Sequence, residues 1–403
     1  MLKLLDGFRV LDLCRLAAGA PTKLADLGAE VIKVEEPPYG DYLRGLPPIM
    51  PDSGVALFYE MINRNKKSLG LNLKADEGRR IFFELLQTAD AVVEISKPGT
   101  FERLGLDYES LRPHKPDLVY CSITGYGQTG PYRALPSHGM NIDATAGLLE
   151  IDHRPGQRPE IRVGSAQGLE VGSAHAALGI VAGLLQRSRT GEGCYIDAAC
   201  WESAVSVNRH AAPAINLPAL NMRFEDPLRP GGIGPKYNVY GTKDDKVVLI
   251  CPIEKKFWAK FCAVVGHEEW IDRGHYGDLP MDYGESDPIL RDDIEAVMRT
   301  RTRDEWVATL LAADVPVSPV LTAGELVDDP HVAERGMVVP GGAGDSRRYV
   351  RLPLLVDGRA AEVSLPAPAL GSHTDEIMAG LGYGPEERGH LRNAGIIAGP
   401  AGD

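Results

Sequence analysis

The sequence has few of the features that mark metal-binding, secreted or membrane-spanning proteins. Its six cysteines, at positions 14, 121, 194, 200, 251 and 262, form no CxxC pair and no spacing of metal ligands. This usage is typical of reduced thiols, so we expect a cytoplasmic protein without a metal site. The N-terminus, MLKLLDGFRV, lacks the long apolar core of a signal peptide. The longest apolar run, at 174–185, is shorter than a bilayer span and predicts a buried helix.

Positive charge is also scarce in this chain. It carries 43 Lys and Arg against 56 Asp and Glu, which leaves a net charge of −13. This excess argues against nucleic acid or a membrane surface as the partner, and any phosphate site must be a local basic cluster. The 403 residues, 44% hydrophobic and 25% charged, have the composition of an ordinary globular protein. They suffice for two domains or for one large domain with an insertion.

Strand-like and helix-like segments alternate in the first 130 residues. An amphipathic helix is expected to begin near Asp76. The expected strands are Arg9–Leu13, Glu30–Val34, Ala91–Glu94 and Leu118–Ile123. This alternation is typical of an α/β fold in which helices cover both faces of a parallel sheet.

The rest of the chain is more varied, and we see no internal repeat. Residues 130–172 are rich in Gly, Pro and polar side chains and predict a loop region. Helical patterns follow at 172–188 and 198–212, and 217–235 is expected to be a linker or mobile loop. A hairpin is expected to run into a helix within VYGTKDDKVVLICPIEKKFW, which begins at Val239.

GYGQTG at 125–130 is a literal GxGxxG motif that follows a predicted strand. This motif suggests a dinucleotide site only where a helix starts directly after it. Here the next residues are PYRALPSHG, which cannot open a helix that would hold a pyrophosphate. We therefore interpret the segment as a glycine-rich turn.

Four motifs occur in the order found in one family. They are LADLGAEVIKVEEPPYGD (24–41), NRNKKSLGLNLK (63–74), EISKPGTFERLGLDYESL (94–111) and PALGSHTDEIMAGLGYGPEE (368–387). Together they resemble the class III CoA-transferases of the CaiB/BaiF type, a family that includes α-methylacyl-CoA racemase. The resemblance covers essentially the whole chain.

The resemblance implies a fold, a substrate and an assembly. We expect a Rossmann-like large domain with a parallel sheet, formed by residues 1–220 and a returning segment at 326–403. A smaller α+β domain is expected at 225–325. The family implies acyl-CoA and a free carboxylic acid as substrates, no permanently bound cofactor, and an interlocked homodimer.

The same resemblance assigns candidate residues for CoA binding and a lid. Arg64, Lys66 and Lys67 form a basic cluster suited to CoA phosphates. Arg103 lies where relatives have a CoA-contacting arginine, and Lys97 stands where many of them have arginine. The glycines of a lid loop over the site are expected at Gly231, Gly232 and Gly234.

The catalytic assignment depends on three residues. His138 matches the racemase base, and histidine as a residue type suits proton transfer near neutral pH. Glu254 matches a glutamate that orients this histidine. The family's catalytic aspartate is replaced by Gly168 or Leu169, which leaves Glu170 as the nearest carboxylate. The weaker candidates are Asp143 and Asp152.

Three functions remain open on these residues. The first is a CoA-transferase that forms an acyl anhydride and then a thioester on Glu170, with His138 and Glu254 assisting. The second is an α-methylacyl-CoA racemase or epimerase with His138 as the base. The third is a catalytically silent CoA-binding subunit that needs a partner.

Overall fold

A computed structural model describes residues 2–16, 19–152, 156–163, 166–220, 234–273, 287–342 and 345–399. The chain divides into two compact units. The first unit joins Met1–Ala211 to Gly336–Asp403, and the second is Ala212–Arg335. The sequence predicted a large domain at 1–220 and 326–403 and a small domain at 225–325. The boundaries between the two units, after Ala211 and after Arg335, lie at other residues.

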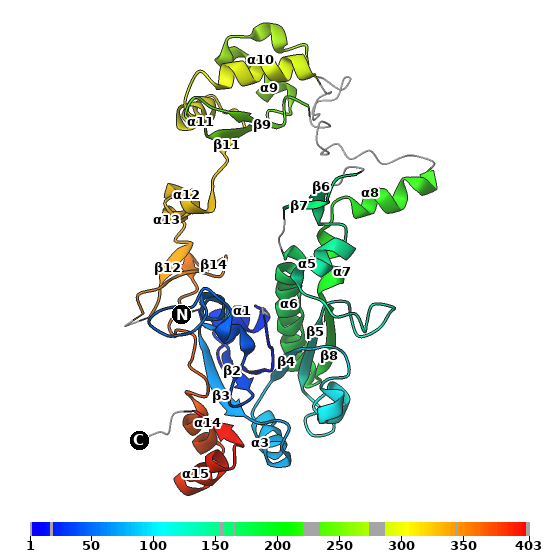
Figure 1. The fold of residues 1–403 in the computed structure, drawn as a ribbon, viewed down its shortest axis with the longest axis vertical. Helices are drawn as coiled ribbons and strands as arrows, with labels where there is room; N and C mark the ends of the chain where they lie inside the picture. Colours follow the sequence, from blue (N-terminus) through cyan, green and yellow to red (C-terminus); the bar gives the residue numbers. More distant parts are fainter. Residues whose placement is uncertain are drawn as a thin grey trace. The chain divides into compact units, whose positions relative to one another are not determined.

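A seven-stranded sheet forms the centre of the first unit (Figure 1). Its strands are β1 (Arg9–Asp12), β2 (Glu30–Glu35), β3 (Lys66–Leu71), β4 (Ala91–Ile95), β5 (Val119–Thr124), β8 (Cys194–Ala199) and β16 (Ile397–Ala398). The order is β16-β3-β2-β1-β4-β5-β8, and only the edge strand β16 is antiparallel to its neighbour. The α/β class with a parallel sheet is therefore confirmed, and the four predicted strands are correct to within one residue at each end.

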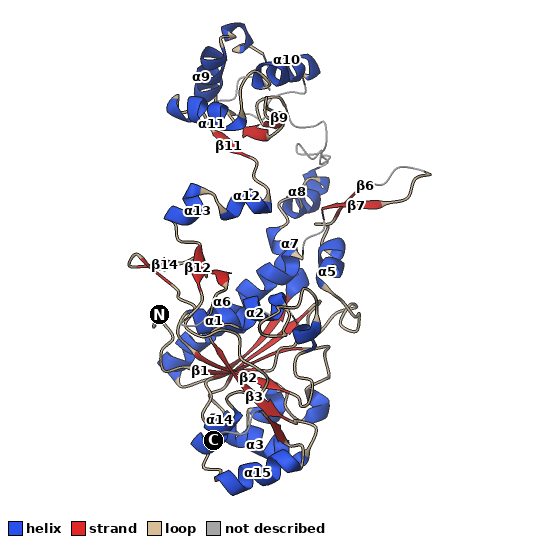
Figure 2. Ribbon diagram, turned by 60° about the vertical axis from the view of Figure 1, so that its left-hand side comes forward, coloured by secondary structure: helices blue, strands red, loops and turns tan. Residues whose placement is uncertain are grey.

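Helices cover both faces of this sheet (Figure 2). Helices α1 (Ala20–Asp26) and α6 (Gln167–Thr190) pack on one face. The other face carries α3 (Asp76–Leu86), α14 (Thr374–Gly380) and α15 (Pro385–Asn393). The strands alternate between two separate apolar clusters: on β5, Val119 and Cys121 belong to the first and Tyr120 to the second. The C-terminal helices α14 and α15 thus form one layer with α3 from the N-terminal half.

The longest helix, α6, contains the apolar run at 174–185. It spans 24 residues, so by length and composition it could cross a membrane, contrary to the expectation from the run alone. Core helices meet the same criterion, and α6 packs against β5, β8 and α7 (Cys200–Val207). Its other side is exposed, with Leu178 at 66% and Leu185 at 58%. The prediction of a buried helix is therefore correct for one side only.

The region 130–172 is not only a loop. It contains α5 (Gly139–Thr145) and an antiparallel pair, β6 (Glu150–Asp152) and β7 (Glu160–Val163). The sequence pattern missed α5 because tertiary contacts hold this short helix. Ile142 packs in the cluster below α6, and Asp143 accepts hydrogen bonds from the first amides of α6.

Shorter elements complete the first unit. They are η1 (Tyr42–Gly45), α2 (Leu57–Asn63), η2 (Glu102–Leu104), α4 (Tyr108–Leu111), β12 (Val338–Pro340), β13 (Arg348–Val350), β14 (Leu355–Val356) and β15 (Arg359–Ala360). Helix α8 (Ala211–Asn216) begins at the boundary between the units.

The second unit has its own core. Strands β9 (Asn238–Gly241), β10 (Val247–Ile250) and β11 (Val317–Pro319) form an antiparallel sheet in the order β11-β10-β9. The other elements are η3 (Pro218–Leu220), α9 (Lys255–Val265), η4 (Glu268–Trp270), α10 (Pro288–Met298), α11 (Arg303–Ala312), α12 (Ala323–Val327) and α13 (Pro330–Glu334). Trp258, Phe261 and Trp306 are buried between sheet and helices. The predicted hairpin followed by a helix is present as β9, β10 and α9.

Candidate active site

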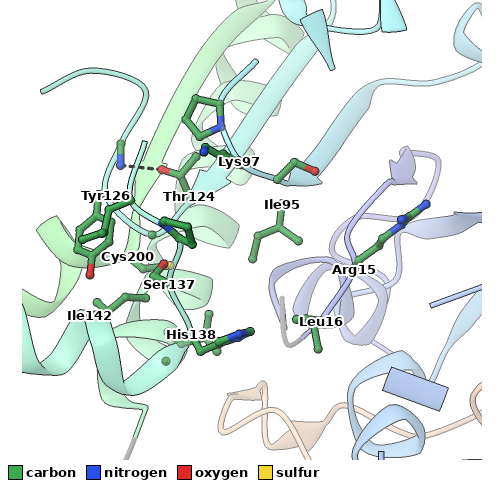
Figure 3. Close-up of a pocket in the computed structure, with 18 of the residues that line it drawn as sticks. Arg15, Leu16, Ile95, Lys97, Thr124, Tyr126, Ser137, His138, Ile142 and Cys200 are labelled. Carbon is green, nitrogen blue, oxygen red and sulfur yellow. Dashed lines mark hydrogen bonds between the residues drawn. The ribbon is translucent and has the colours of Figure 1, made fainter. Parts of the chain in front are cut away.

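A cavity of about 530 Å³ lies at the carboxyl ends of β1, β4 and β5 in the first unit. In open α/β sheets, ligands bind at this edge. Figure 3 shows Arg15 and Leu16, which follow β1, on one side of the cavity, and Thr124, Ser137 and His138 on the other. Arg15 is not among the residues predicted from the sequence, although its place shortly after a predicted strand could have identified it.

The glycine turn after β5 forms part of the cavity wall. Gly127 has φ +91°, and its N–H donates to Thr124 Oγ1 at 2.7 Å. A Cβ on Gly125 would lie 2.2 Å from Ser137 Oγ, so a larger residue would fit here only if the Ser137 hydroxyl turned away. The next helix, α5, starts only at Gly139. The geometry is that of a tight turn and agrees with the interpretation from the sequence.

The charged side chains of the cavity wall are basic, and most of its other residues are apolar or uncharged. It includes Arg15, Lys97, Arg133 and His138. Arg15 is paired with Glu36 at 2.6 Å, and Arg133 lies 3.8 Å from Glu102. Lys97 is exposed and has no ion-pair partner among the described residues. Lys97 is therefore the cation most available to an anionic ligand.

No aspartate or glutamate is among the described residues that line this cavity. The cavity therefore combines cationic groups with an absence of competing acids. That charge distribution favours an anionic ligand, such as a carboxylate.

His138 lies where α5 begins and reaches the cavity from its exposed N-terminus. Its backbone N–H donates to Asn141 Oδ1 at 2.9 Å, which closes the first turn of the helix. The side chain is exposed and points toward Leu16 across the cavity (Figure 3). His138 is thus placed where an imidazole could exchange a proton with a bound ligand.

The first turn of α6 is held by Asp143. This carboxylate is 2% exposed and accepts hydrogen bonds from the N–H groups of Gln167 at 3.0 Å and Gly168 at 2.8 Å. Both bonds satisfy amides that lack a partner within the helix. Asp143 therefore caps the helix. Asp152, the other weaker candidate, lies in β6 and pairs with Arg162 at 3.5 Å.

Leu169 and Glu170 follow this cap, and the structure separates them. Leu169 lines the cavity, whereas Glu170 is exposed and is not among the lining residues. Successive side chains on a helix diverge by about 100°. Glu170 instead faces α1: burial lowers the pKa of Lys23 there, and the charge of Glu170 opposes that shift. Lys23 donates to the Gly19 carbonyl at 3.4 Å, just after the segment that includes Leu16.

Two of the predicted CoA-binding residues have buried partners. Arg64 pairs with Asp26 at 2.6 Å, and Lys66 pairs with Asp12 at 2.8 Å and is 2% exposed. Burial would raise the pKa of Asp12, but the charges of Lys66 and Lys33 outweigh it and lower that pKa. These contacts give Arg64 and Lys66 a structural role that the sequence did not indicate.

The other cations predicted to bind CoA differ in accessibility. Lys67 pairs with Glu30 at 2.8 Å and Glu376 at 2.6 Å. Arg103 is exposed on η2, and its guanidinium lies 3.4 Å from Thr100 Oγ1. Only Lys97 of the predicted cations lines the cavity with His138.

The remaining candidates lie in or beside the second unit. Glu254 is the residue before α9, and the structure does not place it relative to His138. Gly231 and Gly232 lie outside the described residues, while Gly234 is described and buried. Within the described residues, no group of three or more His, Cys, Asp or Glu side chains could hold a metal ion.

Comparison with known proteins identifies the family of this chain. The sequence model of CoA-transferase family III matches residues 5–374. The chain is 33% identical to a succinyl-CoA:mesaconate CoA-transferase from Haloarcula marismortui, over 93% of this chain and 95% of that protein. It is 32% identical to a succinate–glutarate CoA-transferase from Agrobacterium fabrum, over 94% and 95%. A CaiB/BaiF family crystal structure from Brucella suis superposes with a TM-score of 0.76 at 28% identity, over 93% of this chain and 98% of that one. The chain belongs to CoA-transferase family III.

Proposed function

We propose that this protein transfers CoA from an acyl-CoA to a free carboxylic acid, and that at least one of the two acids is a dicarboxylic acid. The observation that supports this most directly is the cavity lined by Arg15, Lys97, Arg133 and His138 without a carboxylate. Such a wall favours a substrate that keeps a second negative charge beside its thioester. The relatives named above act on succinyl, mesaconate and glutarate groups.

The reaction needs one protein carboxylate and no further energy source. In our proposal, the Glu170 side chain turns from its position beside α1 toward the cavity and attacks the thioester carbonyl. The C–S bond breaks, CoA leaves as a thiolate, and a mixed anhydride between the donor acid and Glu170 remains. The thiolate then attacks the glutamyl carbonyl of that anhydride, which releases the donor acid and leaves a glutamyl-CoA thioester. The acceptor carboxylate repeats both steps in reverse order and departs as the new acyl-CoA.

The remaining residues would assist without covalent chemistry. Lys97 would hold an anionic part of the substrate, and His138 would stabilise charge or move a proton near the thioester. The first unit would bind CoA, and Glu254 of the second would support His138. A cytoplasmic location is consistent with such substrates.

The proposal is tested by incubating the protein with succinyl-CoA and, in turn, glutarate, mesaconate, oxalate and acetate in heavy water. We expect CoA to appear on a dicarboxylate, which chromatography of the thioesters measures, with acetate as the poorer acceptor. A second sample holds 2-methylacyl-CoA without an acceptor acid. Exchange of its α-hydrogen for deuterium, in the absence of any transfer, would replace this proposal by the racemase alternative.

A second candidate function follows from the same cavity. Because Leu169 occupies the wall and no acid does, the chain could bind acyl-CoA as the silent subunit of a two-chain enzyme. Tight CoA binding by calorimetry, combined with neither transfer nor exchange in the assay above, would favour this candidate.

We also propose that the protein acts as a homodimer. The exposed side of α6 carries Ala174, Leu178, Ala182 and Leu185, which recur at helical spacing on one face. An apolar stripe on a core helix favours a second copy of the chain as its cover.

Charges on this stripe are expected to dissociate the dimer. The Leu178→Glu/Leu185→Glu variant should sediment as a monomer, because burying two carboxylates in an apolar interface is costly. Leu311→Glu, at a position that is 68% exposed on α11, is the matched control and should stay dimeric. If the double variant remains a dimer in analytical ultracentrifugation, the interface lies elsewhere.

A further inference from the structure

A second cavity, of about 210 Å³, lies beside strands β4, β5 and β8 on the face of the sheet that carries α3 and α14. On the face that carries α3 and α14, Tyr120 is still part of the apolar core. Its neighbour in register on β8 is Tyr195, which is 41% exposed. The next side chains on this face are Glu94, Ser122 and Asp197, aligned across β4, β5 and β8. Of these three, Glu94 and Ser122 line the cavity, together with Tyr108 and Glu109 of α4.

Glu94 forms the inner end of this cavity. It is only 4% exposed, and its Oε2 atom has no hydrogen-bond partner among the described residues. Burial raises the pKa of Glu94 to about 8; a hydrogen bond with Ser122 opposes this shift, and the nearby charge of Asp197 adds to it. A buried carboxyl oxygen without a partner costs free energy. Because the terminal torsion of a glutamate is soft, this carboxyl can turn toward a donor in the cavity.

Three tyrosine rings form the walls. The ring centroids of Tyr108 and Tyr195 are 5.4 Å apart, and those of Tyr120 and Tyr195 are 6.1 Å apart. The Tyr120 hydroxyl donates to the Leu106 carbonyl at 3.0 Å, which fixes that ring. Aromatic faces attract cations and pack well against methylene groups.

The mouth of this cavity is acidic. Glu102, Asp107 and Glu109 line it, opposed by Lys97 and Arg133. Arg133 is already 3.8 Å from Glu102, so its charge is partly balanced. With Glu94 included, carboxyl groups outnumber cations four to two in the lining. The first cavity has the opposite charge, although the two share Lys97 and Arg133.

We propose that this second cavity is a binding site for a small primary ammonium compound. Its N–H groups donate to the Oε2 atom of Glu94, which has no partner among the described residues, and its methylene groups pack between the tyrosine rings. A primary amine is favoured over a quaternary one because only the former has a hydrogen to donate. The inference is independent of the proposed CoA transfer.

Binding also has a defined proton balance. A neutral Glu94 carboxyl and an ammonium ion become a carboxylate–ammonium pair, and one proton passes to the solvent. The heat of binding at pH 7 must therefore differ between buffers whose ionisation enthalpies differ.

The test is isothermal titration of the full chain at pH 7 with n-propylammonium chloride, in phosphate and in MOPS buffer. We expect saturable binding, release of close to one proton, and weaker binding of the neutral isostere n-propanol and of tetramethylammonium. Glu94→Gln should weaken binding roughly 10- to 100-fold and abolish proton release. Tyr195→Ala should weaken it roughly two- to fivefold. Glu77→Gln, on the exposed side of α3, is the matched control and should bind as the unmodified protein.

Three results would overturn the proposal. The first is the absence of saturable heat when n-propylammonium is in roughly 50-fold excess over the protein at about millimolar concentration, near the weak end of ligand binding. The second is equal affinity for n-propanol. The third is unchanged binding by a Glu94→Gln variant whose circular dichroism spectrum is native. In each case the cavity would hold water only.

Discussion

Replacing Glu170 by glutamine is expected to lower kcat for CoA transfer by at least about 10³-fold, because an amide cannot form the acyl anhydride. Binding of acyl-CoA should change little, since Glu170 is not among the residues that line the cavity. Steady-state rates and calorimetric affinities measured on the same preparation separate these two effects.

A double variant tests whether the position of the acid decides the reaction. In Leu169→Asp/Glu170→Gln, the carboxylate moves by one residue to the side chain that lines the cavity. We expect this variant to recover a substantial part of the lost rate. Its control is Leu169→Asn/Glu170→Gln, which has the same shape without the charge and should stay inactive.

Trapping provides the direct check on the covalent step. Hydroxylamine added during turnover should convert the glutamyl-CoA thioester into a hydroxamate, and peptide mass spectrometry should find it on the peptide that contains Glu170. A hydroxamate on another peptide, or full activity of Glu170→Gln, would contradict the assignment.

The second large effect concerns the buried pair of Lys66 and Asp12. Replacing Lys66 by methionine is expected to destabilise the protein by about 3–5 kcal/mol, because it leaves the fully buried Asp12 carboxylate without its nearest partner. The free energy of unfolding from urea titration measures this. Lys74→Met is the matched control, since Lys74 is 70% exposed beside Glu36 and should lose less than about 1 kcal/mol.

The pH dependence of this loss has a defined sign. The pKa of Asp12 is lowered in the folded protein, so its contribution is present above the unfolded pKa and is lost as the pH falls through the folded value. The difference between the unmodified protein and Lys66→Met should therefore shrink in acid. A difference of less than 1 kcal/mol at pH 7 would show that Lys66 is not needed for stability and would return it to the candidates for CoA binding.

Much of the fold could be predicted because its signals are local. The four predicted strands, which correspond to β1, β2, β4 and β5, are short apolar runs between turn residues. Such runs are typical of strands that are buried on both faces of a parallel sheet. Helix α5 was missed because Ile142 and Asp143 gain their partners only from α6, about 25 residues later in the chain. Local propensity carries no information about such contacts.

The candidate site was predicted unevenly for the same reason. His138 and Lys97 were assigned from the family motifs, and the structure brings both to one cavity: Lys97 follows β4 directly, and His138 lies at the start of α5. Arg64 and Lys66 also stand beside a strand, yet they are paired with acids that lie 38 and 54 residues earlier. A basic cluster in a sequence does not reveal whether its charges are free.

By itself, the sequence determined the α/β class, the strand positions and the membership of the family, because alternation and motif order are properties of neighbouring residues. Only the tertiary structure decided which charges are available and which side chain of the first turn of α6 lines the cavity. Those outcomes depend on the packing of segments far apart in the chain: α5 fixes the start of α6, and helical rotation then places Leu169 in the cavity wall and turns Glu170 toward α1.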